Sequence, residues 1–366
     1  MSAELAPRQR QVRQARPFAV ASPAPRRAWE EVLASAPRAL PSQTPGWLDC
    51  VCAVGGYENV SRLYETVDGR RLVLPLVRRT VLRRVFCTEA SLPMGWGPAG
   101  LLGEGGVVRP EDVRMVFADL AGHHAAGVAL RPDPMTATSW EEGSPSGVVR
   151  QPLMAQTLSL AGGFEKVWRS RFRSDTRNRV RRAQRAGVVV QRDDSGGLVP
   201  LFHELYAKSV DRWARRAGEP VALARWRAAR REPERKLRTV AAVCGTRCRV
   251  YSALVDGRPV AAIVVLFGTA AAAYWRGAMD EEVAGRTYAN YLLHRTAIED
   301  AAGAGCAAYH MGDSAPGSPL ALFKSRFGAV DQHYSSYRLE RLPVSALTER
   351  TRRRVSESLR RRRGRE

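Results

Sequence analysis

Residues 255–265 read Val-Asp-Gly-Arg-Pro-Val-Ala-Ala-Ile-Val-Val, and residues 67–77 read Val-Asp-Gly-Arg-Arg-Leu-Val-Leu-Pro-Leu-Val. In each stretch an apolar run precedes an Asp-Gly pair and a second apolar run follows it. This pattern is the strongest short-range indication of a β-hairpin, because Asp and Gly tolerate positive φ. The two phrases look like a repeat and predict a chain built from two similar halves.

The residues around the first hairpin predict a small mixed α/β unit. A Gly/Pro-rich loop is expected at 93–106, and the connection from 132 to about 149 is polar. Helical spacing of apolar residues after a proline predicts a helix over 110–126, ended by Gly127. The expected strands are 60–67, 71–77, 81–87 and 128–131.

The second half repeats this mixture of helices and strands at greater length. Apolar residues at helical or alternating spacing separate the two kinds of element. The expected helices are 164–187, 199–217, 285–302 and 320–327, and the expected strands are 188–191, 237–244, 249–255, 260–267, 271–276, 306–311 and 332–339. The fold class is therefore α/β (α+β), with two mixed-sheet modules in tandem.

Composition excludes several classes of protein. The chain has 366 residues, of which 45% are hydrophobic and 26% charged, as is usual for a globular protein rather than a fibrous or disordered one. The longest uncharged stretch, 259–275, is interrupted by Gly268-Thr269, so we interpret it as strand, turn, strand rather than a membrane helix. No secretory signal is visible, and we expect a cytoplasmic protein.

The net charge of +22 is a strong indication of a polyanionic partner, either a nucleic acid or an anionic membrane surface. Arginines gather in an N-terminal arm (1–39) and a C-terminal tail (343–366), which we expect to be flexible. A third cluster lies inside the chain and should be structured; we assign nucleic-acid contacts there to Arg177, Arg179, Arg181 and Arg182. The alternative is a general preference for arginine, since only four positive residues are lysines.

Three phrases carry a resemblance to a known family. They are the basic helix with its following Gly and strand at 177–188 (RNRVRRAQRAGV), the helix start at 288–293 (YANYLL) and the ending at 322–328 (LFKSRFG). In order and spacing they resemble the FemAB-like family of tandem-GNAT enzymes, which typically transfer amino acids from aminoacyl-tRNA onto peptidoglycan precursors and include relatives that use other donors and acceptors. The resemblance covers roughly 40–340 and implies a degenerate GNAT-like domain at 40–155 and a GNAT-like acyltransferase domain at 156–342.

The resemblance implies that Phe323 and Lys324 line the catalytic centre, where the lysine neutralises charge at the transferred acyl group. A lysine in a chain that otherwise uses arginine also indicates a compact point charge. The alternative is a surface lysine on a short helix, with Phe323 packed below it. Asp313 and His310, at the end of one strand, are candidates for the proton acceptor, or have ordinary strand-end roles.

Further residues are candidates for substrate binding. Trp275 and Arg276, at the end of a central strand, could hold an acyl chain or the acceptor, or Trp275 could pack in the core. Tyr288 and Asn290 head a helix, where capping is the alternative. Trp96 lies in the loop Gly95–Gly100, which resembles the family's acceptor-side loop, and Arg326 lies in the 322–328 phrase.

The donor depends on the segment 280–290, Asp-Glu-Glu-Val-Ala-Gly-Arg-Thr-Tyr-Ala-Asn. With one glycine, three acids and a bulky tyrosine, it makes a poor backbone cradle for a pyrophosphate. We therefore favour aminoacyl-tRNA over acyl-CoA as the donor; in either case the donor is a cosubstrate and no bound cofactor is expected. The amine acceptor could be a peptidoglycan precursor, another cell-envelope component or a secondary metabolite.

Two alternatives stay open. One is an acyl-CoA-dependent GNAT N-acetyltransferase acting on a small amine or sugar, and the other is a non-enzymatic nucleic-acid-binding protein supported by charge alone. The His123-His124 pair has no carboxylate or cysteine at ligand spacing, so we expect no metal site. We expect tRNA and an amine-bearing acceptor as partners, with no stable protein partner, and the charge also permits a peripheral contact with an anionic membrane.

Overall fold

The hairpin at Asp256-Gly257 forms at the centre of the second half in the computed structural model, which describes residues 18–81 and 86–340. Strands β11 (Cys248–Val255) and β12 (Arg258–Phe267) pair antiparallel across a two-residue turn. Asp256 has φ of 49° and Gly257 has φ of 75°, the positive values that a tight hairpin turn demands. This part of the prediction is confirmed.

The hairpin at Asp68-Gly69 also forms, but in another sheet. Strands β3 (Arg62–Thr66) and β4 (Arg71–Leu74) pair antiparallel through a longer turn, and they belong to a 4-stranded sheet of order β1-β3-β4-β7. The β11–β12 hairpin instead lies in an 11-stranded sheet. The two halves therefore share a motif without using it in the same place.

The first half holds short strands and three helices longer than two turns. Its strands are β1 (Phe18–Ala21), β2 (Glu58–Asn59), β3, β4, β5 (Val77–Val81), β6 (Phe86–Ala90), β7 (Leu102–Gly103), β8 (Gly127–Leu130) and β9 (Val149–Ser159). Its α-helices are α1 (Arg26–Ser35), α2 (Pro45–Gly55), α3 (Pro110–Ala121) and α4 (Ala137–Gly143), and single turns of 3₁₀ helix occur at Pro41–Gln43, Glu104–Gly106 and Pro134–Thr136.

The second half has longer strands and more helices. Its helices are α5 (Gly163–Lys166), a π turn at Val167–Arg171, α6 (Ser174–Arg185), α7 (Val199–Ala217), α8 (Val221–Arg231), α9 (Glu234–Cys244), a 3₁₀ turn at Gly245–Arg247, α10 (Glu281–Thr287), α11 (Ala289–Gly303) and α12 (Pro319–Ser325). Its strands are β10 (Val189–Asp193), β11, β12, β13 (Ala271–Met279), β14 (Ala308–Asp313) and β15 (Val330–Glu340).

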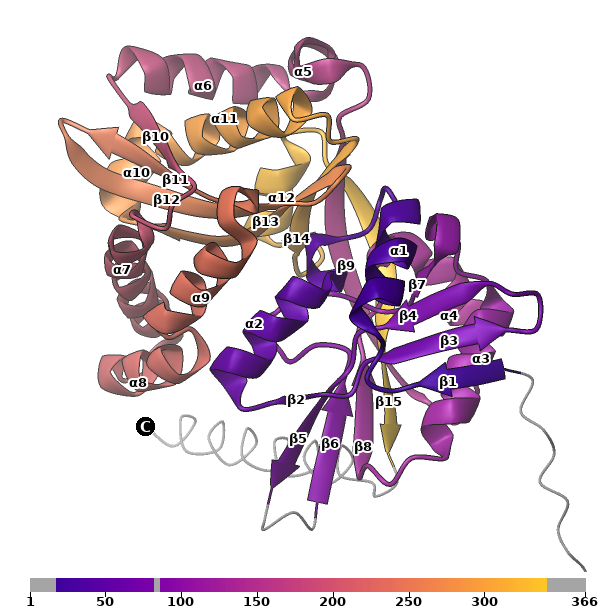
Figure 1. Ribbon diagram of the computed structural model, residues 1–366. Helices are drawn as coiled ribbons and strands as arrows, with labels where there is room; N and C mark the ends of the chain where they lie inside the picture. The colour runs from indigo at the N-terminus through magenta and orange to yellow at the C-terminus, as the bar shows by residue number, and fades with distance from the viewer. Residues whose placement is uncertain (1–17, 82–85, 341–366) are drawn as a thin grey trace, which may run out of the picture.

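The large sheet joins the two halves. Its order is β10-β11-β12-β13-β14-β9-β15-β8-β6-β5-β2, so β9 from the first half lies between two strands of the second half. Strand β15 pairs with β9 over most of its length and then with β8. The last strand of each half thus pairs with strands of the other, and Figure 1 shows β9 and β15 in the region between the two halves.

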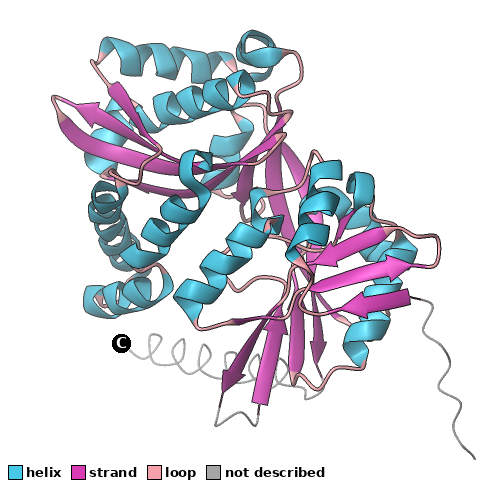
Figure 2. Ribbon diagram, in the orientation of Figure 1, coloured by secondary structure: helices cyan, strands magenta, loops and turns pink. Residues whose placement is uncertain are grey.

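Helices cover both faces of the second half's strands (Figure 2). On one face α6 and α11 enclose a core that contains Tyr251, Ile263 and Phe327. On the other face α7, α9 and α2 enclose a core that contains Trp47 and Val264, and a third core fills the first half. Helix α2 of the first half packs on α9 of the second, so the second core is shared between the halves.

The α/β prediction is confirmed, but several elements differ from the expected ones. Residues 237–244 are helix α9 rather than a strand, because Leu237, Val240 and Ala241 are buried at helical spacing behind a proline. Short apolar runs are ambiguous between the two states. Helices α4 and α8 and strand β9 were not expected. Strand β9 is central in the sheet and partly buried, but it contains Pro152 and the polar Gln156, which are unusual in such a strand and make it hard to predict.

Element ends also differ. Helix α3 stops at Ala121, because Gly122 takes the cap position that we assigned to Gly127. The helix expected over 164–187 breaks at the π turn, and the one expected over 285–302 breaks at Tyr288, whose φ is 56°. The strands expected at 71–77 and 81–87 are instead β4, β5 and β6.

One expectation about the ends of the chain is wrong, and another concerns residues that the structure does not describe. Residues 18–39, which we assigned to a flexible arm, hold β1 and α1, because Trp29 and Val32 of α1 are fully buried in the core. Residues 1–17 and the expected tail at 343–366 lie outside the described residues. The expected boundary at 155/156 lies within β9, whose strand partners all belong to β14 and β15.

Candidate active site

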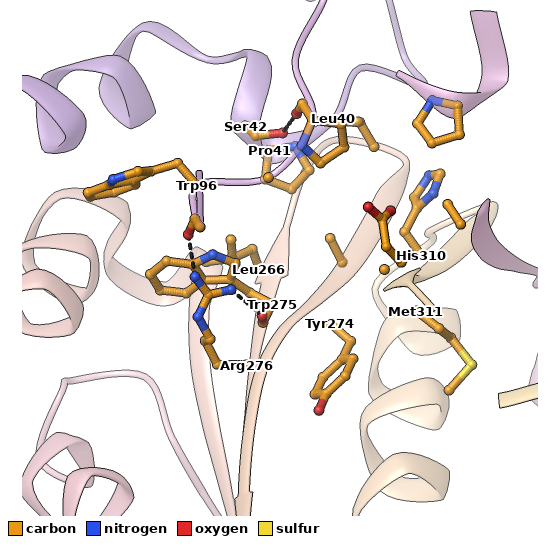
Figure 3. Close-up of a pocket in the computed structure, with 18 of the residues that line it drawn as sticks. Leu40, Pro41, Ser42, Trp96, Leu266, Tyr274, Trp275, Arg276, His310 and Met311 are labelled. Carbon is orange, nitrogen blue, oxygen red and sulfur yellow. Dashed lines mark hydrogen bonds between the residues drawn. The ribbon is translucent and has the colours of Figure 1, made fainter. Parts of the chain in front are cut away.

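A cavity of about 290 Å³ lies where the two halves meet (Figure 3). Both halves contribute to its wall: the 3₁₀ turn at Pro41, the loop at Gly95–Pro98 and Arg131 come from the first, and residues of β13, β14 and α12 from the second. Five residues predicted from the sequence line it, namely Trp96, Trp275, Arg276, Asp313 and Lys324, together with His310.

The cavity exists because two parallel strands separate. Strands β13 and β14 pair only over 271–273 with 308–310. Beyond that point Tyr274, Trp275 and Arg276 continue on one side and Met311, Gly312 and Asp313 on the other, and all six line the cavity. A gap between parallel strands exposes backbone and side chains that a paired ladder would cover, so a substrate can reach them there.

Lys324 enters the cavity wall from α12. Its side chain is 2% exposed, and Nζ donates hydrogen bonds to the carbonyl oxygens of Gly312 (2.9 Å) and Asp313 (2.8 Å). Burial lowers its pKa to about 8, so the ammonium is still protonated at pH 7. An ammonium has three N–H groups, and these two bonds leave one for a substrate.

The Asp313 carboxylate is held by residues distant in sequence. Arg131 forms an ion pair with it, and the Tyr334 hydroxyl donates to both of its oxygens at 3.0 Å. Burial raises the pKa of Tyr334, so the hydroxyl stays protonated. Sequence reasoning missed Arg131 and Tyr334, because neither lies in a recognisable phrase.

His310 borders the same part of the cavity as a neutral imidazole. Burial lowers its pKa to about 4, and Nδ1 lies 3.1 Å from Oγ1 of Thr157 on β9. Of the two proton-acceptor candidates, His310 is therefore an uncharged base at pH 7, whereas Asp313 is already occupied by a cation and a hydroxyl.

Three tryptophans meet at the other end of the cavity. Trp47, Trp96 and Trp275 have ring centroids 5.1–6.2 Å apart, and Trp47 Nε1 donates to the carbonyl oxygen of Trp96 at 3.0 Å. Figure 3 shows Trp275 beside Arg276 on this side. Trp275 thus packs against the shared core and also borders the cavity; that it holds an acyl chain or the acceptor stays a prediction.

A buried ion cluster, which sequence reasoning missed, supports the tryptophans. Lys236 of α9 lies 4.4 Å from the ring centroid of Trp96 and donates to Glu232 (2.9 Å) and to the carbonyl oxygen of Gly95 (3.1 Å). Arg276 donates to the same carboxylate (2.6 Å) and the same carbonyl. Lys236 is one of only four lysines in the chain, which is the signal that could have identified it.

The other predicted residues gather outside this cavity, at the start of α11. The guanidinium of Arg179 lies 5.0 Å from the ring centroid of Tyr291, and that of Arg182 lies 4.8 Å from the ring of Tyr288. Arg326 donates to the Tyr291 hydroxyl at 3.0 Å, and Arg179 bonds the same oxygen. We call Arg179, Arg182, Arg326, Tyr288 and Tyr291 the arginine–tyrosine cluster.

Four predicted residues have other surroundings. Arg177 donates to backbone carbonyls of residues 168, 169 and 172, and Arg181 donates to Asn178. Asn290 contacts the Met279 sulfur. Phe323 packs against Tyr291 and Phe327 in the core, with ring centroids 5.0 and 5.2 Å away, and does not line the cavity.

The segment before α11 is itself helical. Residues Glu281–Thr287 form α10, and the acids at its start pair with cations of α7: Glu281 with Arg212 and Arg216, and Asp280 with Lys208. The first turn of α10 is acidic, because Glu281 and Glu282 both lie in it. No group of side chains suited to a metal ion occurs within 18–81 and 86–340.

Comparisons with known proteins agree with this geometry. The family model described as "Acetyltransferase (GNAT) domain" matches residues 170–318. Among solved structures, that of FemX has 13% identity and a TM-score of 0.63, covering 88% of this chain and 98% of the other. The C-terminal domain of a candidate lysylphosphatidylglycerol synthetase from Agrobacterium fabrum has 12% identity and a TM-score of 0.50, covering 82% and 89%. The search of curated proteins found no match.

Residues 170–318 therefore form a GNAT domain, and the chain is an acyltransferase. Its fold is that of the FemAB-like tandem GNAT proteins, as the resemblance predicted. The non-enzymatic alternative does not agree with this result. In the described part of the chain, no helix has both the length and the apolar composition to cross a membrane.

Proposed function

We propose that this acyltransferase moves an aminoacyl group from aminoacyl-tRNA to an amine acceptor. The observation that carries the choice of donor is the arginine–tyrosine cluster at the start of α11. Three guanidinium groups surround two tyrosine rings there, and within the described residues the carboxylate that forms ion pairs with them is that of Asp175. Arginines beside the partly exposed ring of Tyr288 suit a single-stranded RNA end, whose phosphates pair with the cations and one of whose bases stacks on that ring.

A CoA pyrophosphate fits this region less well. It binds best to the backbone N–H groups of an open glycine-rich loop before a helix. Here α10 occupies that segment, and Glu281 and Glu282 stand in its first turn. The same position thus carries acids where a pyrophosphate cradle needs free N–H groups.

The proposed reaction takes place beside Lys324. The acceptor amine attacks the ester carbonyl, a C–N bond forms, and the bond to the 3′-oxygen of the tRNA breaks. The third N–H of Lys324 stabilises the negative charge that develops on the carbonyl oxygen. His310, neutral at pH 7, takes the amine proton, which leaves with the 3′-oxygen.

The acceptor is an amine on a peptidoglycan precursor, another cell-envelope component or a secondary metabolite. The net charge of +22 also supports peripheral contact with an anionic membrane, where lipid-linked acceptors reside. A cytoplasmic location and the absence of a bound cofactor belong to the same proposal.

Filter binding of aminoacylated and deacylated tRNA tests the donor. At about 0.2 M salt, where non-specific phosphate contacts are weak, the protein should prefer charged tRNA, and excess acetyl-CoA should not compete. Replacing Arg179 and Arg182 by Ala should weaken this binding at least tenfold. The matched control removes the same charge from the same helix at Arg181 and Arg185, which do not touch the tyrosines, and should weaken binding only slightly.

An acyl-CoA-dependent N-acyltransferase is the second candidate, because the matching family model is described as an acetyltransferase domain. Saturable binding of acetyl-CoA, together with tRNA binding that ignores the aminoacyl group, would make it the leading one. The arginine–tyrosine cluster would then contact the CoA phosphates.

A further inference from the structure

The cavity beside Lys324 is large and mostly apolar. Its volume is about 290 Å³, whereas an apolar cavity of about 150 Å³ suffices to bind benzene. Apolar side chains from both halves make most of its wall. They are Leu40, Pro41, Trp47, Trp96, Pro98, Pro134, Ala155, Leu266, Ala273, Trp275, Met311 and Leu320.

Apart from Lys324, whose third N–H faces the reacting carbonyl in the proposed function, the charged side chains on the wall are already paired within the protein. Arg131 pairs with Asp313, and Arg276 pairs with Glu232. The imidazole of His310 bonds Thr157, and the Ser42 hydroxyl donates to the carbonyl of Pro98. An acyl group with a positively charged side chain would thus find no uncommitted carboxylate in the wall, and burying a charge without a partner is strongly unfavourable.

We infer that this cavity receives the acyl part of the donor, and that this acyl part carries a bulky, uncharged, apolar side chain of branched aliphatic or aromatic type. The inference rests on the proposed function, because the proposed function is what places the reacting carbonyl beside Lys324. An acetyl, glycyl or alanyl group would leave most of the space to water and make few contacts. In an apolar pocket each missing methylene costs about 10–200-fold in selection.

Two alanines keep the space open. Ala273 of β13 faces Leu266 across the β12–β13 ladder, and Ala155 of β9 is in register with Asp313. Both line the cavity with a single methyl group. Leucine at position 273 adds three carbon atoms to the wall and should exclude large acyl groups, while small ones still fit.

Stable amide analogues of the aminoacylated tRNA end test the inference without an acceptor. The compounds are 3′-deoxy-3′-aminoadenosine carrying L-phenylalanyl, glycyl or L-lysyl groups, and binding is followed by the fluorescence of the tryptophans around the cavity. The phenylalanyl compound should bind at least about 100-fold more tightly than the glycyl compound. The lysyl compound should bind no better than the glycyl one.

The variants make the test specific to the cavity. Ala273→Leu should remove the preference for phenylalanyl and leave glycyl binding unchanged. Ala229→Leu, the same substitution at an exposed position on α8, should change neither. Glycyl or lysyl binding as tight as phenylalanyl binding overturns the inference, as does an unchanged preference in folded Ala273→Leu protein.

A parallel pair of CoA esters separates this inference from the donor proposal. If the adenosine compounds fail to bind but phenylacetyl-CoA binds more tightly than acetyl-CoA, with the same effect of Ala273→Leu, the donor proposal fails and the cavity inference holds. If charged tRNA binds as proposed but glycyl and phenylalanyl compounds bind equally, only the cavity inference fails. Binding of neither series overturns both.

Discussion

A buried lysine lies near each end of the cavity, and the two differ in their partners: Lys324 is part of the cavity wall, whereas Lys236 lies behind the tryptophans that line the other end. Lys324 and Lys236 are both 2% exposed, and burial lowers the pKa of each to about 8. Lys236 has a carboxylate, Glu232, at 2.9 Å and lies against two tryptophan rings. Within the described residues, Lys324 hydrogen-bonds two backbone carbonyls, and the Asp313 carboxylate acts on its charge without a hydrogen bond to it.

This difference separates a structural cation from one available for chemistry. The charge of Lys236 is neutralised within the protein, where it ties the loop at Gly95 of the first half to α9 of the second. The charge of Lys324 has no carboxylate bonded to it, so a substrate that develops negative charge can gain the interaction. Substitutions at the two positions should therefore change different properties.

Replacing Lys324 by Met should have the largest effect. The variant should lose about 10²–10³-fold in the rate of acyl transfer, the usual effect of removing one oxyanion donor. Binding of charged tRNA and cooperative unfolding should persist, because Met fills the same space. Single-turnover transfer from charged tRNA measures the rate, and Lys208→Met, on the surface of α7, is the control. Turnover equal to wild type would exclude Lys324 from the site.

Replacing Glu232 by Gln should test the other end through stability. Both Lys236 and Arg276 would lose their carboxylate, and leaving buried cations uncompensated costs about 3–5 kcal/mol. Urea unfolding followed by tryptophan fluorescence measures the change. The matched control is Glu234→Gln, two residues away, whose exposed pair with Arg238 should contribute less than about 1 kcal/mol. Equal effects of the two substitutions would contradict a structural role for the Lys236 cluster.

The contrast also shows what the sequence alone can predict. Most elements of the second half follow from local patterns; helix Val199–Ala217, for example, has the predicted ends. Strand β9 and helix α9 do not, because their state depends on neighbours that the sequence does not bring together. The pairing of β9 with β15, which joins the two halves, cannot be predicted from local sequence patterns either. Strands so far apart in the sequence are brought together by tertiary packing.

The same limit applies to the candidate site. Lys324 is identifiable because it lies in a phrase of family residues and is a rare lysine. Lys236 is equally rare, but α9 has no such phrase around it. Arg131 is 182 residues from the Asp313 that it pairs with, and only the completed sheet brings the two together. Phe323 lies in the same family phrase as Lys324, but it packs in the core, because adjacent residues of a helix face different directions.

The pH dependence of transfer should follow the ammonium of Lys324. Its pKa is lowered to about 8, so the charged form predominates below pH 8 and is lost as pH rises above it. We expect the rate, corrected for spontaneous ester hydrolysis and for the unprotonated fraction of the acceptor amine, to fall towards tenfold per pH unit above pH 8. Stability should change in the opposite direction: between pH 8 and the ordinary lysine pKa the unfolded chain binds more protons, so this contribution to the free energy of unfolding rises with pH.

Because activity and stability should change in opposite directions above pH 8, unfolding can be excluded as the cause of a loss of activity. If transfer falls above pH 8 while the folded fraction, measured by circular dichroism, is unchanged, the loss belongs to the site. The residual transfer rate of the Lys324→Met variant should not decrease above pH 8. A rate that stays level to pH 10 would show that transfer does not need the ammonium.

A third lysine should show the smallest effect and complete the comparison. Lys208 of α7 pairs with Asp280 at 2.9 Å, a distance equal to that between Lys236 and Glu232, but its side chain is 58% exposed. Water and salt screen such a pair, so Lys208→Ala should change the free energy of unfolding by less than about 1 kcal/mol and leave the transfer rate unchanged. Urea unfolding at low and high salt measures it. A larger loss would show that distance between the charges, rather than burial, decides what each lysine contributes.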